Sequence, residues 1–346
     1  MHIFITGHMG YVGPSVVRQL RSSFPEATLT GFDTGYFSTC LTGLDATPES
    51  LLDKQYRGDV RRLDEKMLAG VDAIVHLAAI SNDPMGNQYE QLTFDVNYEA
   101  CIALAKKAKN CGVKQFVFAS SCSVYGCADQ GARSESSEVN PLTAYAKSKV
   151  MSEQALVALA DTQFKVTCLR FPTACGMSGR LRLDLVLNDF VASAFTSKKI
   201  TILSDGTPWR PLINVKDMAR AIDWAVSREG DAYLVINAGS DDANYRVSDL
   251  ARAVADRISG VEISINQNAS PDKRSYQVSF QRFRELAGEV YQPRYDLDAT
   301  IDELKQGLEE MEFSDSDFRN SFLIRLNYLN HLRSEKLLDE GLFWVG

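Results

Sequence analysis

A short segment near the start of the chain constrains its fold more than any other feature. Residues 6–13 read TGHMGYVG, so three glycines stand three positions apart, after an apolar run and before a stretch with apolar residues at helical spacing. Gly7 can make a tight turn, Gly10 lets a ligand approach the backbone, and Gly13 lets a helix pack closely on a sheet. The segment therefore predicts a strand-to-helix turn that binds a pyrophosphate at the helix N-terminus.

An acidic residue follows at the distance that a dinucleotide-binding unit requires. A second apolar run ends at Asp33, about 20 residues after the last glycine, where an acid accepts the hydroxyls of the adenosine ribose. No arginine follows directly to receive a 2′-phosphate, so the pattern favours NAD over NADP. The alternative is that Asp33 is an ordinary turn aspartate.

Composition narrows the class of protein. With 346 residues, 45% apolar and 24% charged, the chain is expected to be globular, with one large or two moderate domains. The net charge of −8 disfavours nucleic acid or an anionic membrane as partner, and no apolar run is long enough to span a bilayer. Because the first expected strand begins at residue 2, we expect no signal peptide and a cytoplasmic location. Seven scattered cysteines indicate reduced thiols, and four dispersed histidines indicate no metal site.

Strands and helices are expected to alternate through the first half of the chain. Strand candidates lie at residues 2–6, 27–32, 55–57, 73–77, 115–120 and 165–170. This pattern predicts an α/β fold with a doubly wound parallel Rossmann sheet and, where the alternation becomes irregular, a smaller interleaved C-terminal substrate lobe. We expect the dinucleotide-binding domain at 1–170, with 212–238 returning to it. Residues 171–346 would form mainly the substrate lobe, with a helical tail from about 315 that packs on the body.

A tyrosine and a lysine carry the expected chemistry. Tyr145 and Lys149 stand four residues apart on a predicted helix, which places both on one face. The ammonium can lower the phenol pKa and hold a ribose, so Tyr145 can serve as general base or acid in an alcohol–ketone interconversion. Ser121 lies upstream at the carboxyl end of an expected strand, where open α/β sheets place their active sites.

In this order and spacing, these signals resemble the extended short-chain dehydrogenase/reductase family of nucleotide-sugar epimerases and dehydratases. The resemblance covers roughly residues 1–310 and includes Gly58-Asp59-Val60, His76-Leu77-Ala78-Ala79, Asn97 and the run SSCSVYG at 120–126. It implies that Ser121, Tyr145 and Lys149 are catalytic. The residues that it implies for NAD binding are Gly7, Gly10, Tyr11, Val12, Gly13, Asp33, Asp59, Val60, Leu77, Ala78, Ala79, Asn97, Tyr145 and Lys149.

The resemblance also implies a nucleoside-diphosphate sugar as substrate. Arg210 matches the arginine that clamps the diphosphate, a task that suits the guanidinium fork. The other substrate residues that it implies are Ser123, Thr173, Asn188 and Arg274. For Asn97 and Asn188 the alternative is a capping or turn amide, and for His76 a core histidine. A homodimer through the helices at about 104–108 and 150–156 is also implied, unless these residues face the sheet.

Differences within the family narrow the reaction. Dehydratases carry an Asp-Glu pair directly after the serine or threonine, where this chain has Cys122 and Ser123, and the 3,5-epimerase/reductases require a cysteine where it has Ser123. The resemblance therefore favours oxidation and reduction at C4, most simply a 4-epimerase that passes through a transient 4-keto sugar.

Two alternatives stay open. The stretch 180–190 resembles a subgroup that handles deoxyhexose or heptose nucleotides in surface-polysaccharide pathways, so a 4-dehydrogenase or 4-ketoreductase is one of them. In that stretch Arg180 and Arg182 would either contact phosphate or lie on a solvated face. The other alternative is a non-catalytic dinucleotide-binding sensor or scaffold, because the fold does not guarantee catalysis.

Overall fold

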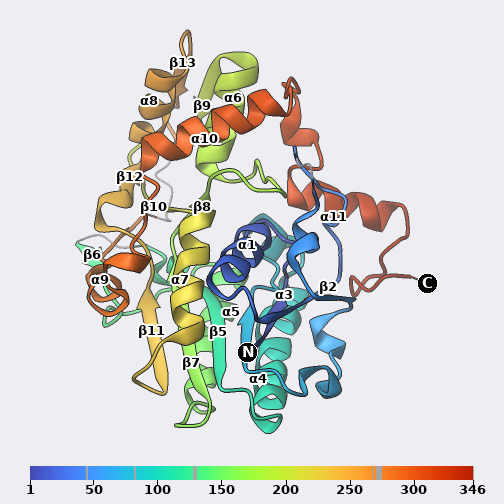
Figure 1. The fold of residues 1–346 in the computed structure, drawn as a ribbon. Helices are drawn as coiled ribbons and strands as arrows, with labels where there is room; N and C mark the ends of the chain where they lie inside the picture. Colours follow the sequence, from blue (N-terminus) through green and yellow to red (C-terminus); the bar gives the residue numbers. More distant parts are fainter. Residues whose placement is uncertain (44–45, 82, 128–130, 267, 270–274, 346) are drawn as a thin grey trace.

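The computed structural model describes residues 1–43, 46–81, 83–127, 131–266, 268–269 and 275–345 (Figure 1). The strands are β1 His2–Thr6, β2 Thr28–Asp33, β3 Lys54–Arg57, β4 Ala73–His76, β5 Gln115–Ser121, β6 Ala132–Arg133, β7 Lys165–Phe171, β8 Thr173–Cys175, β9 Lys199–Ile202, β10 Trp209–Asn214, β11 Tyr233–Asn237, β12 Asn244–Arg246, β13 Glu262–Ile265 and β14 Gln277–Val278. The helices are α1 Gly13–Ser23, α2 Asp83–Gln88, α3 Glu90–Phe94, α4 Ala100–Asn110, α5 Ala144–Val157, α6 Val186–Ser197, α7 Val215–Ser227, α8 Val247–Arg257, α9 Gln281–Ala287, α10 Leu297–Glu310 and α11 Arg325–Ser334.

Seven strands form one parallel sheet, in the order β11-β7-β5-β4-β1-β2-β3. The chain builds outward from β1 to β3 on one side and from β4 to β11 on the other, so the strand order reverses between β1 and β4. The ends of these two strands lie together, because Thr6 pairs with His76 and the Thr6 hydroxyl oxygen is 2.7 Å from Nδ1 of His76. A crevice opens beyond the carboxyl ends of the strands at such a reversal, which is where ligands bind.

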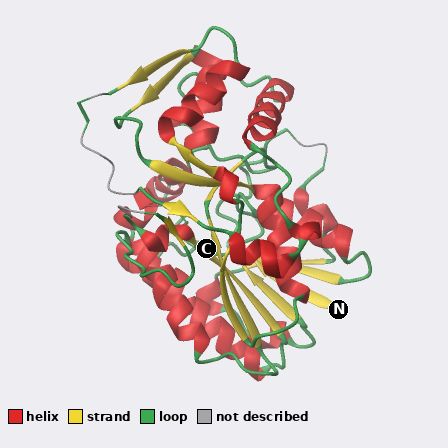
Figure 2. Ribbon diagram, turned by 90° about the vertical axis from the view of Figure 1, so that its left-hand side faces the viewer, coloured by secondary structure: helices red, strands yellow, loops and turns green. Residues whose placement is uncertain are grey.

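Helices cover both faces of this sheet (Figure 2). Along β1, Ile3 and Ile5 belong to the core that includes α1 and α7, whereas Phe4 belongs to the core that includes α4 and α5. Successive strand residues point to opposite faces, and a parallel sheet must be covered on both. Leu104 in α4 and Leu156 in α5 lie in the same core as Phe4, so these helix positions face the sheet. The prediction of an α/β fold with a doubly wound parallel sheet is confirmed.

After β7 the chain builds a second region, in the upper part of Figure 1. It contains the small sheets β12-β10-β8 and β13-β9 and the mutually packed helices α6, α8 and α10. Between these elements, α7 packs on α1, and β11 pairs with β7 at the edge of the large sheet. The second region is therefore interleaved with the first along the chain and lies beyond the crevice.

The end of the chain is less helical than its apolar spacing suggests. A 3₁₀ helix, Phe318–Asn320, precedes α11, and the residues after α11 form turns and one bridge between Leu338 and Trp344. Local side-chain bonds compete with a helix here: Asp315 accepts a 2.8 Å hydrogen bond from the backbone N–H of Asp317. Across the described ranges no helix is both long and apolar enough to cross a membrane.

Candidate active site

A cavity of 1330 Å³ lies between the large sheet and the second region. Pockets for one small-molecule ligand measure roughly 300–1,000 Å³, so this cavity is large enough for two ligands. The sequence-predicted site residues that line it are Gly7, Gly10, Tyr11, Val12, Asp33, Asp59, Val60, Leu77, Ala78, Ala79, Ser121, Ser123, Tyr145, Lys149, Thr173 and Arg210. The structure thus brings most of the predicted residues together.

The glycine loop forms a cradle without room for side chains. Gly7 has φ +78°, and a Cβ on it would lie 2.5 Å from the backbone nitrogen of Ala78, while a Cβ on Gly13 would lie 1.9 Å from the carbonyl oxygen of His8. No side chain caps the start of α1, so the N–H groups of its first turn are available to an anion. The loop and the helix end therefore fit the diphosphate of a dinucleotide.

Asp33 is fixed beside this cradle at the end of β2. One carboxylate oxygen accepts a 2.9 Å hydrogen bond from the backbone N–H of Met9, and the other accepts a 2.8 Å bond from that of Gly35. Each carboxylate oxygen has a second lone pair, so the residue can still accept ribose hydroxyls. The described residues thus fit the adenosine half of NAD.

Asn97 and Gly13 do not line the cavity but support its walls. The Asn97 side chain accepts a 2.8 Å hydrogen bond from the N–H of Ile80 and donates a 3.0 Å bond to its carbonyl oxygen. It therefore holds the loop that follows β4. Gly13 is buried against His8, where it lets α1 approach the sheet.

Asn188, in α6, is fully buried and also lies outside the cavity lining. Its amide donates to the Tyr11 hydroxyl at 2.9 Å and to the Arg182 carbonyl at 2.8 Å, and its oxygen accepts from the N–H of Gly176 at 3.1 Å. The residue joins the glycine loop to the loop before α6. Arg274 lies outside the described residues.

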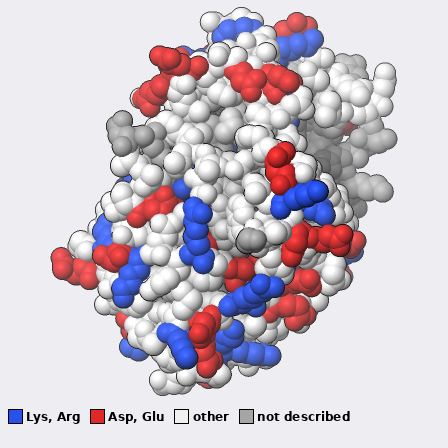
Figure 3. Space-filling view, turned by 90° about the vertical axis from the view of Figure 1, so that its right-hand side faces the viewer, with Lys and Arg blue, Asp and Glu red and all other residues white. Residues whose placement is uncertain are grey.

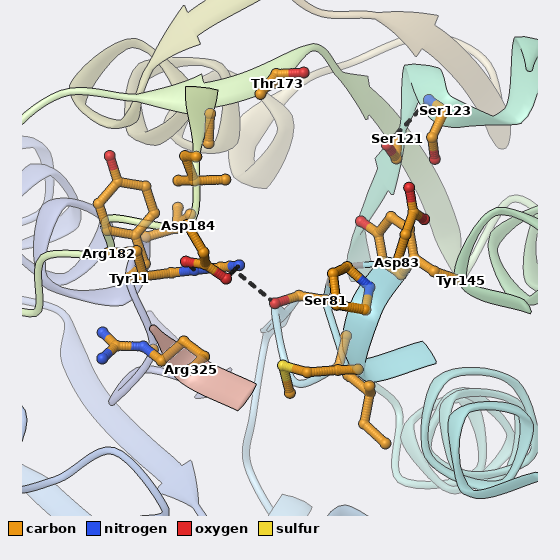
Figure 4. A pocket seen from close by; sticks show the side chains of 18 of the residues that line it. Tyr11, Ser81, Asp83, Ser121, Ser123, Tyr145, Thr173, Arg182, Asp184 and Arg325 are labelled. Atoms are coloured by element: carbon orange, nitrogen blue, oxygen red, sulfur yellow. Dashed lines mark hydrogen bonds and ion pairs between the residues drawn. The ribbon is translucent and has the colours of Figure 1, made fainter. Parts of the chain in front are cut away.

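Ser121, Tyr145 and Lys149 come from two adjacent elements. Ser121 ends β5, whereas Tyr145 and Lys149 lie in the first turns of α5, which begins after the cap residue Thr143. The Lys149 ammonium donates a 2.7 Å hydrogen bond to the carbonyl oxygen of Ala119 and lies 5.5 Å from the centre of the Tyr145 ring. Figure 4 shows the Ser121 and Tyr145 side chains on the same side of the pocket.

Burial dominates the protonation of this cluster. It raises the pKa of Tyr145 to about 12, although a hydrogen bond with Ser121 acts to lower it, and it lowers the pKa of Lys149 to about 8. Near neutral pH the phenol is therefore protonated and the ammonium still charged. The strongest lowering influence on the phenol pKa comes from Ser121, whereas the sequence argument expected it from Lys149.

Asp83 belongs to the site although none of the sequence motifs includes it. This residue follows β4, lines the cavity and lies beside Tyr145 in Figure 4, and its charge acts to raise the pKa of that phenol. Its position just beyond the carboxyl end of a central parallel strand was the available signal.

The arginines of the loop before α6 are buried, so the alternative that they lie on a solvated face is wrong. Arg182 forms a 2.9 Å ion pair with Asp184 and donates a 3.1 Å hydrogen bond to the Ser81 hydroxyl at the cavity wall (Figure 4). Arg180 forms a 2.7 Å ion pair with Glu49. Burial with a partner carboxylate makes both arginines part of the structure of the cleft.

Ser123 presents an unused hydroxyl to the cavity. Its oxygen is buried and has no hydrogen-bond partner among the described residues, a costly arrangement unless a ligand supplies one. Thr173 in β8 and Arg210 in β10 line the same cavity from the second region. Within the described part of the chain, no three His, Cys, Asp or Glu side chains are grouped so that they could hold a metal ion.

The reversal of strand order, the glycine cradle, Asp33 and the Ser-Tyr-Lys cluster define a dinucleotide-dependent α/β enzyme. A sequence model of the NAD dependent epimerase/dehydratase family matches residues 3–239. The chain therefore belongs to this family, and its cofactor is NAD.

The individual relatives named here share at most 28% of their residues with this chain. The chain is 28% identical over 237 residues to a UDP-glucose 4-epimerase of Lactobacillus helveticus, covering 64% of this chain and 69% of the relative. It is 26% identical over 242 residues to a dTDP-glucose 4,6-dehydratase of Streptomyces griseus, covering 69% and 73%. Among solved structures, UDP-glucuronic acid 4-epimerase from Bacillus cereus, in complex with UDP-glucuronic acid and NAD, has a similar fold. The TM-score is 0.76 at 22% identity, covering 90% of this chain and 99% of that one.

Proposed function

We propose that this enzyme interconverts the C4 epimers of a nucleoside-diphosphate sugar through a transient 4-keto sugar. The observation that carries the proposal is the Ser121, Tyr145 and Lys149 cluster at a cavity that has room for both a dinucleotide and a substrate. Relatives named UDP-glucose 4-epimerase support the reaction type.

In this mechanism Tyr145 accepts the proton of the sugar 4-hydroxyl and later returns it to the same oxygen. Ser121 donates a hydrogen bond to that oxygen and also bonds the phenol. NAD, when bound, would supply the hydride acceptor and donor for C4, and the positive charge of its oxidised ring would favour the ionised phenol. Lys149 would hold the nicotinamide ribose. Between the two transfers the ketone turns within the cavity, so that the second transfer occurs on its other face.

The second region would bind the remainder of the substrate. Arg210 would clamp the diphosphate, with Arg274 as a second cation, while Ser123 and Thr173 would bind sugar hydroxyls. Asn188 would act indirectly through the loop that it holds. The proposal includes an NAD-binding domain at 1–170 joined by 212–238. The rest of 171–346 would be mainly a substrate lobe, followed by a C-terminal tail from about 315 that packs on the body.

We extend the proposal to assembly and location. Leu104 and Leu156 face the sheet, so a homodimer through α4 and α5 would use other positions on these helices. Met151 and Val157 on α5, which are 37% and 48% exposed, are candidates. A cytoplasmic site in surface-polysaccharide synthesis would suit an enzyme whose substrates are activated sugars.

Dehydration at C5 and C6 is disfavoured at this site. Cys122 is fully buried with its Sγ directed to the Arg170 carbonyl oxygen, and burial raises the pKa of its thiol. Ser123 carries a hydroxyl, so no carboxylate pair follows Ser121 as in the 4,6-dehydratases. Asp83 supplies one carboxylate near Tyr145, which does not complete such a pair.

The test is to incubate the purified protein with UDP-, GDP-, CDP- and dTDP-sugars, following absorbance near 340 nm and separating the products. A C4 epimer without net NADH would support the proposal. Stoichiometric NADH with a keto sugar would replace it by a 4-dehydrogenase or a ketoreductase running in reverse. NAD binding without turnover of any sugar would favour a sensor or scaffold. Tyr145→Phe is the control for chemistry at this site.

A further inference from the structure

The C-terminal segment, residues 318–345, lies beyond the part of the chain that the family model matches. It nevertheless forms part of the cavity wall, through Arg319, Ile324, Arg325, Leu329 and Leu342. In Figure 1 its helix α11 lies on the β2 side of the molecule, away from α8 and α9. The segment is therefore placed to contact the cofactor end of the cavity.

The segment is bonded to the residues that directly follow Asp33. The indole N–H of Trp344 donates a 2.7 Å hydrogen bond to the carbonyl oxygen of Thr34, and the Tyr36 hydroxyl donates to the carbonyl oxygen of Leu342. These contacts join the segment to the loop that carries the ribose-binding acid.

A second set of contacts reaches the adenine side. Arg61 pairs with Asp59 at 2.6 Å and donates a 2.8 Å hydrogen bond to the carbonyl oxygen of Gly341. The guanidinium groups of Arg61 and Arg62 lie 3.8 Å and 3.7 Å from the centre of the Phe343 ring, which is close cation–π packing. The segment thus contacts the ion-pair partner of Asp59 as well as the residues that follow Asp33, and these are the two acids expected to bind adenosine.

Apolar packing closes the space between these contacts. Leu329, Leu332, Leu338 and Leu342 form one core with Ile80, Met85 and Tyr89 from the loop and helix after β4. At the other end of the segment, Arg319 forms a 2.7 Å ion pair with Asp189 of α6. Figure 3 shows this side of the molecule, where acidic and basic side chains are interspersed. The segment is held by packing and specific bonds, and not by a large area of one charge.

We infer that the C-terminal segment is an outer wall of the NAD site and retains the bound dinucleotide. Leu342 lines the same cavity as Asp33 and Asp59, so adenosine seated by these two acids would lie against the segment, and movement of the segment would release it. Retention requires NAD binding alone and is independent of which sugar reacts. Its benefit rests on the proposed function, since an epimerase returns the hydride to the sugar that gave it and has no need to exchange its cofactor.

The test measures cofactor release directly. Wild type and the double variant Phe343→Ala/Trp344→Ala are loaded with NADH, and the loss of bound NADH fluorescence is followed after a chase with excess NAD. We expect dissociation at least ten-fold faster in the variant, with less NAD in the purified protein. Val345→Ala is the matched control, because this neighbouring side chain is 57% exposed and does not line the cavity.

Dissociation in the double variant within two-fold of wild type would overturn the inference. If the double variant does not fold, Tyr36→Phe replaces it, because this change removes only the hydroxyl that bonds Leu342. Faster release from Tyr36→Phe supports the inference and unchanged release contradicts it. Hydrogen exchange of residues 318–345 gives a second readout: NAD should slow it, and equal exchange with and without NAD would contradict retention. Both readouts stand even if no C4 epimerisation is found.

Discussion

Lys149 donates a 2.7 Å hydrogen bond to the carbonyl oxygen of Ala119, two residues before Ser121. The bond joins the start of α5 to the end of β5, and so it sets Tyr145 against Ser121. The lysine is 3% exposed, which makes both its charge and its bond sensitive to the surroundings. This relationship leads to the first two predictions.

Tyr145→Phe should lower kcat by about 10²–10⁴-fold, because it removes the only group in the proposed mechanism that moves the O4 proton. NAD content should stay close to that of the wild type, since the ring and its packing remain. Turnover is measured with the best substrate of the panel, and NAD is quantified after denaturation. Tyr56→Phe, at an exposed tyrosine outside the cavity lining, is the matched control. Wild-type turnover in Tyr145→Phe would exclude the catalytic assignment.

Lys149 should impose an alkaline limit on activity. Its pKa is lowered to about 8 from 10.5 by burial, so the ammonium is lost and kcat/KM falls as the pH rises through about 8. Lys149→Arg keeps a charge at this position, and its alkaline limit should move to higher pH at a lower overall rate. The pH profile of kcat/KM measures this shift, and an unchanged limit in the arginine variant would contradict the assignment.

Activity should fall as Lys149 loses its proton, whereas the free energy of unfolding should rise. Between pH 8 and 10.5 the unfolded chain binds more protons at this lysine than the folded chain does, so its contribution to the free energy of unfolding rises with pH. Urea denaturation of wild type and Lys149→Met on both sides of pH 8 isolates this contribution. Activity lost above pH 8 while the fold persists would show that deprotonation, and not unfolding, is responsible.

Gly7→Ala and Gly112→Ala form a matched pair. Their φ angles are +78° and +79°, but a Cβ on Gly7 would lie 2.5 Å from the backbone nitrogen of Ala78, whereas nothing lies within 4 Å of one on Gly112. Gly112→Ala should cost about 1–2 kcal/mol from backbone strain alone. Gly7→Ala should cost clearly more and also abolish NAD binding. Urea titration and NAD titration measure both effects, and equal costs would contradict the close approach of the two loops.

The buried Glu153–Arg170 pair supports the strands behind the site. Arg170 donates to both carboxylate oxygens of Glu153: Nη2 donates to Oε2 at 2.7 Å, and Nε donates to Oε1 at 3.0 Å and to Oε2 at 3.2 Å. Ser120, beside Ser121, also donates to Oε1. Glu153→Ala leaves a buried charge without its partner and should cost about 3–5 kcal/mol in unfolding free energy. Glu309→Ala, which removes an exposed pair with Lys305, should change it by less than about 0.5 kcal/mol. Similar urea midpoints for the two variants would count against this role.

The central sheet and much of the site could be predicted because their signals are local. The alternation of Ile3, Phe4 and Ile5 between two faces follows from strand geometry, and the spacing of Tyr145 and Lys149 follows from helix geometry. The turn at position 7 has no room for a Cβ, and so this position must be glycine wherever this strand-to-helix connection occurs. Such constraints act between near neighbours and can be read from the order of residues.

The sequence alone thus determined the dinucleotide-binding sheet, the glycine cradle and the Ser-Tyr-Lys cluster. Only the tertiary structure decided that Arg182 is buried against Asp184, that Asp83 faces Tyr145, and that the C-terminal segment returns to Asp33 and Asp59. Charged residues have the same local pattern whether they are solvated or paired, and the Arg61–Gly341 bond joins positions 280 residues apart. The packing of the whole chain selects such contacts, because their free energy depends on burial and on partners that no local pattern specifies.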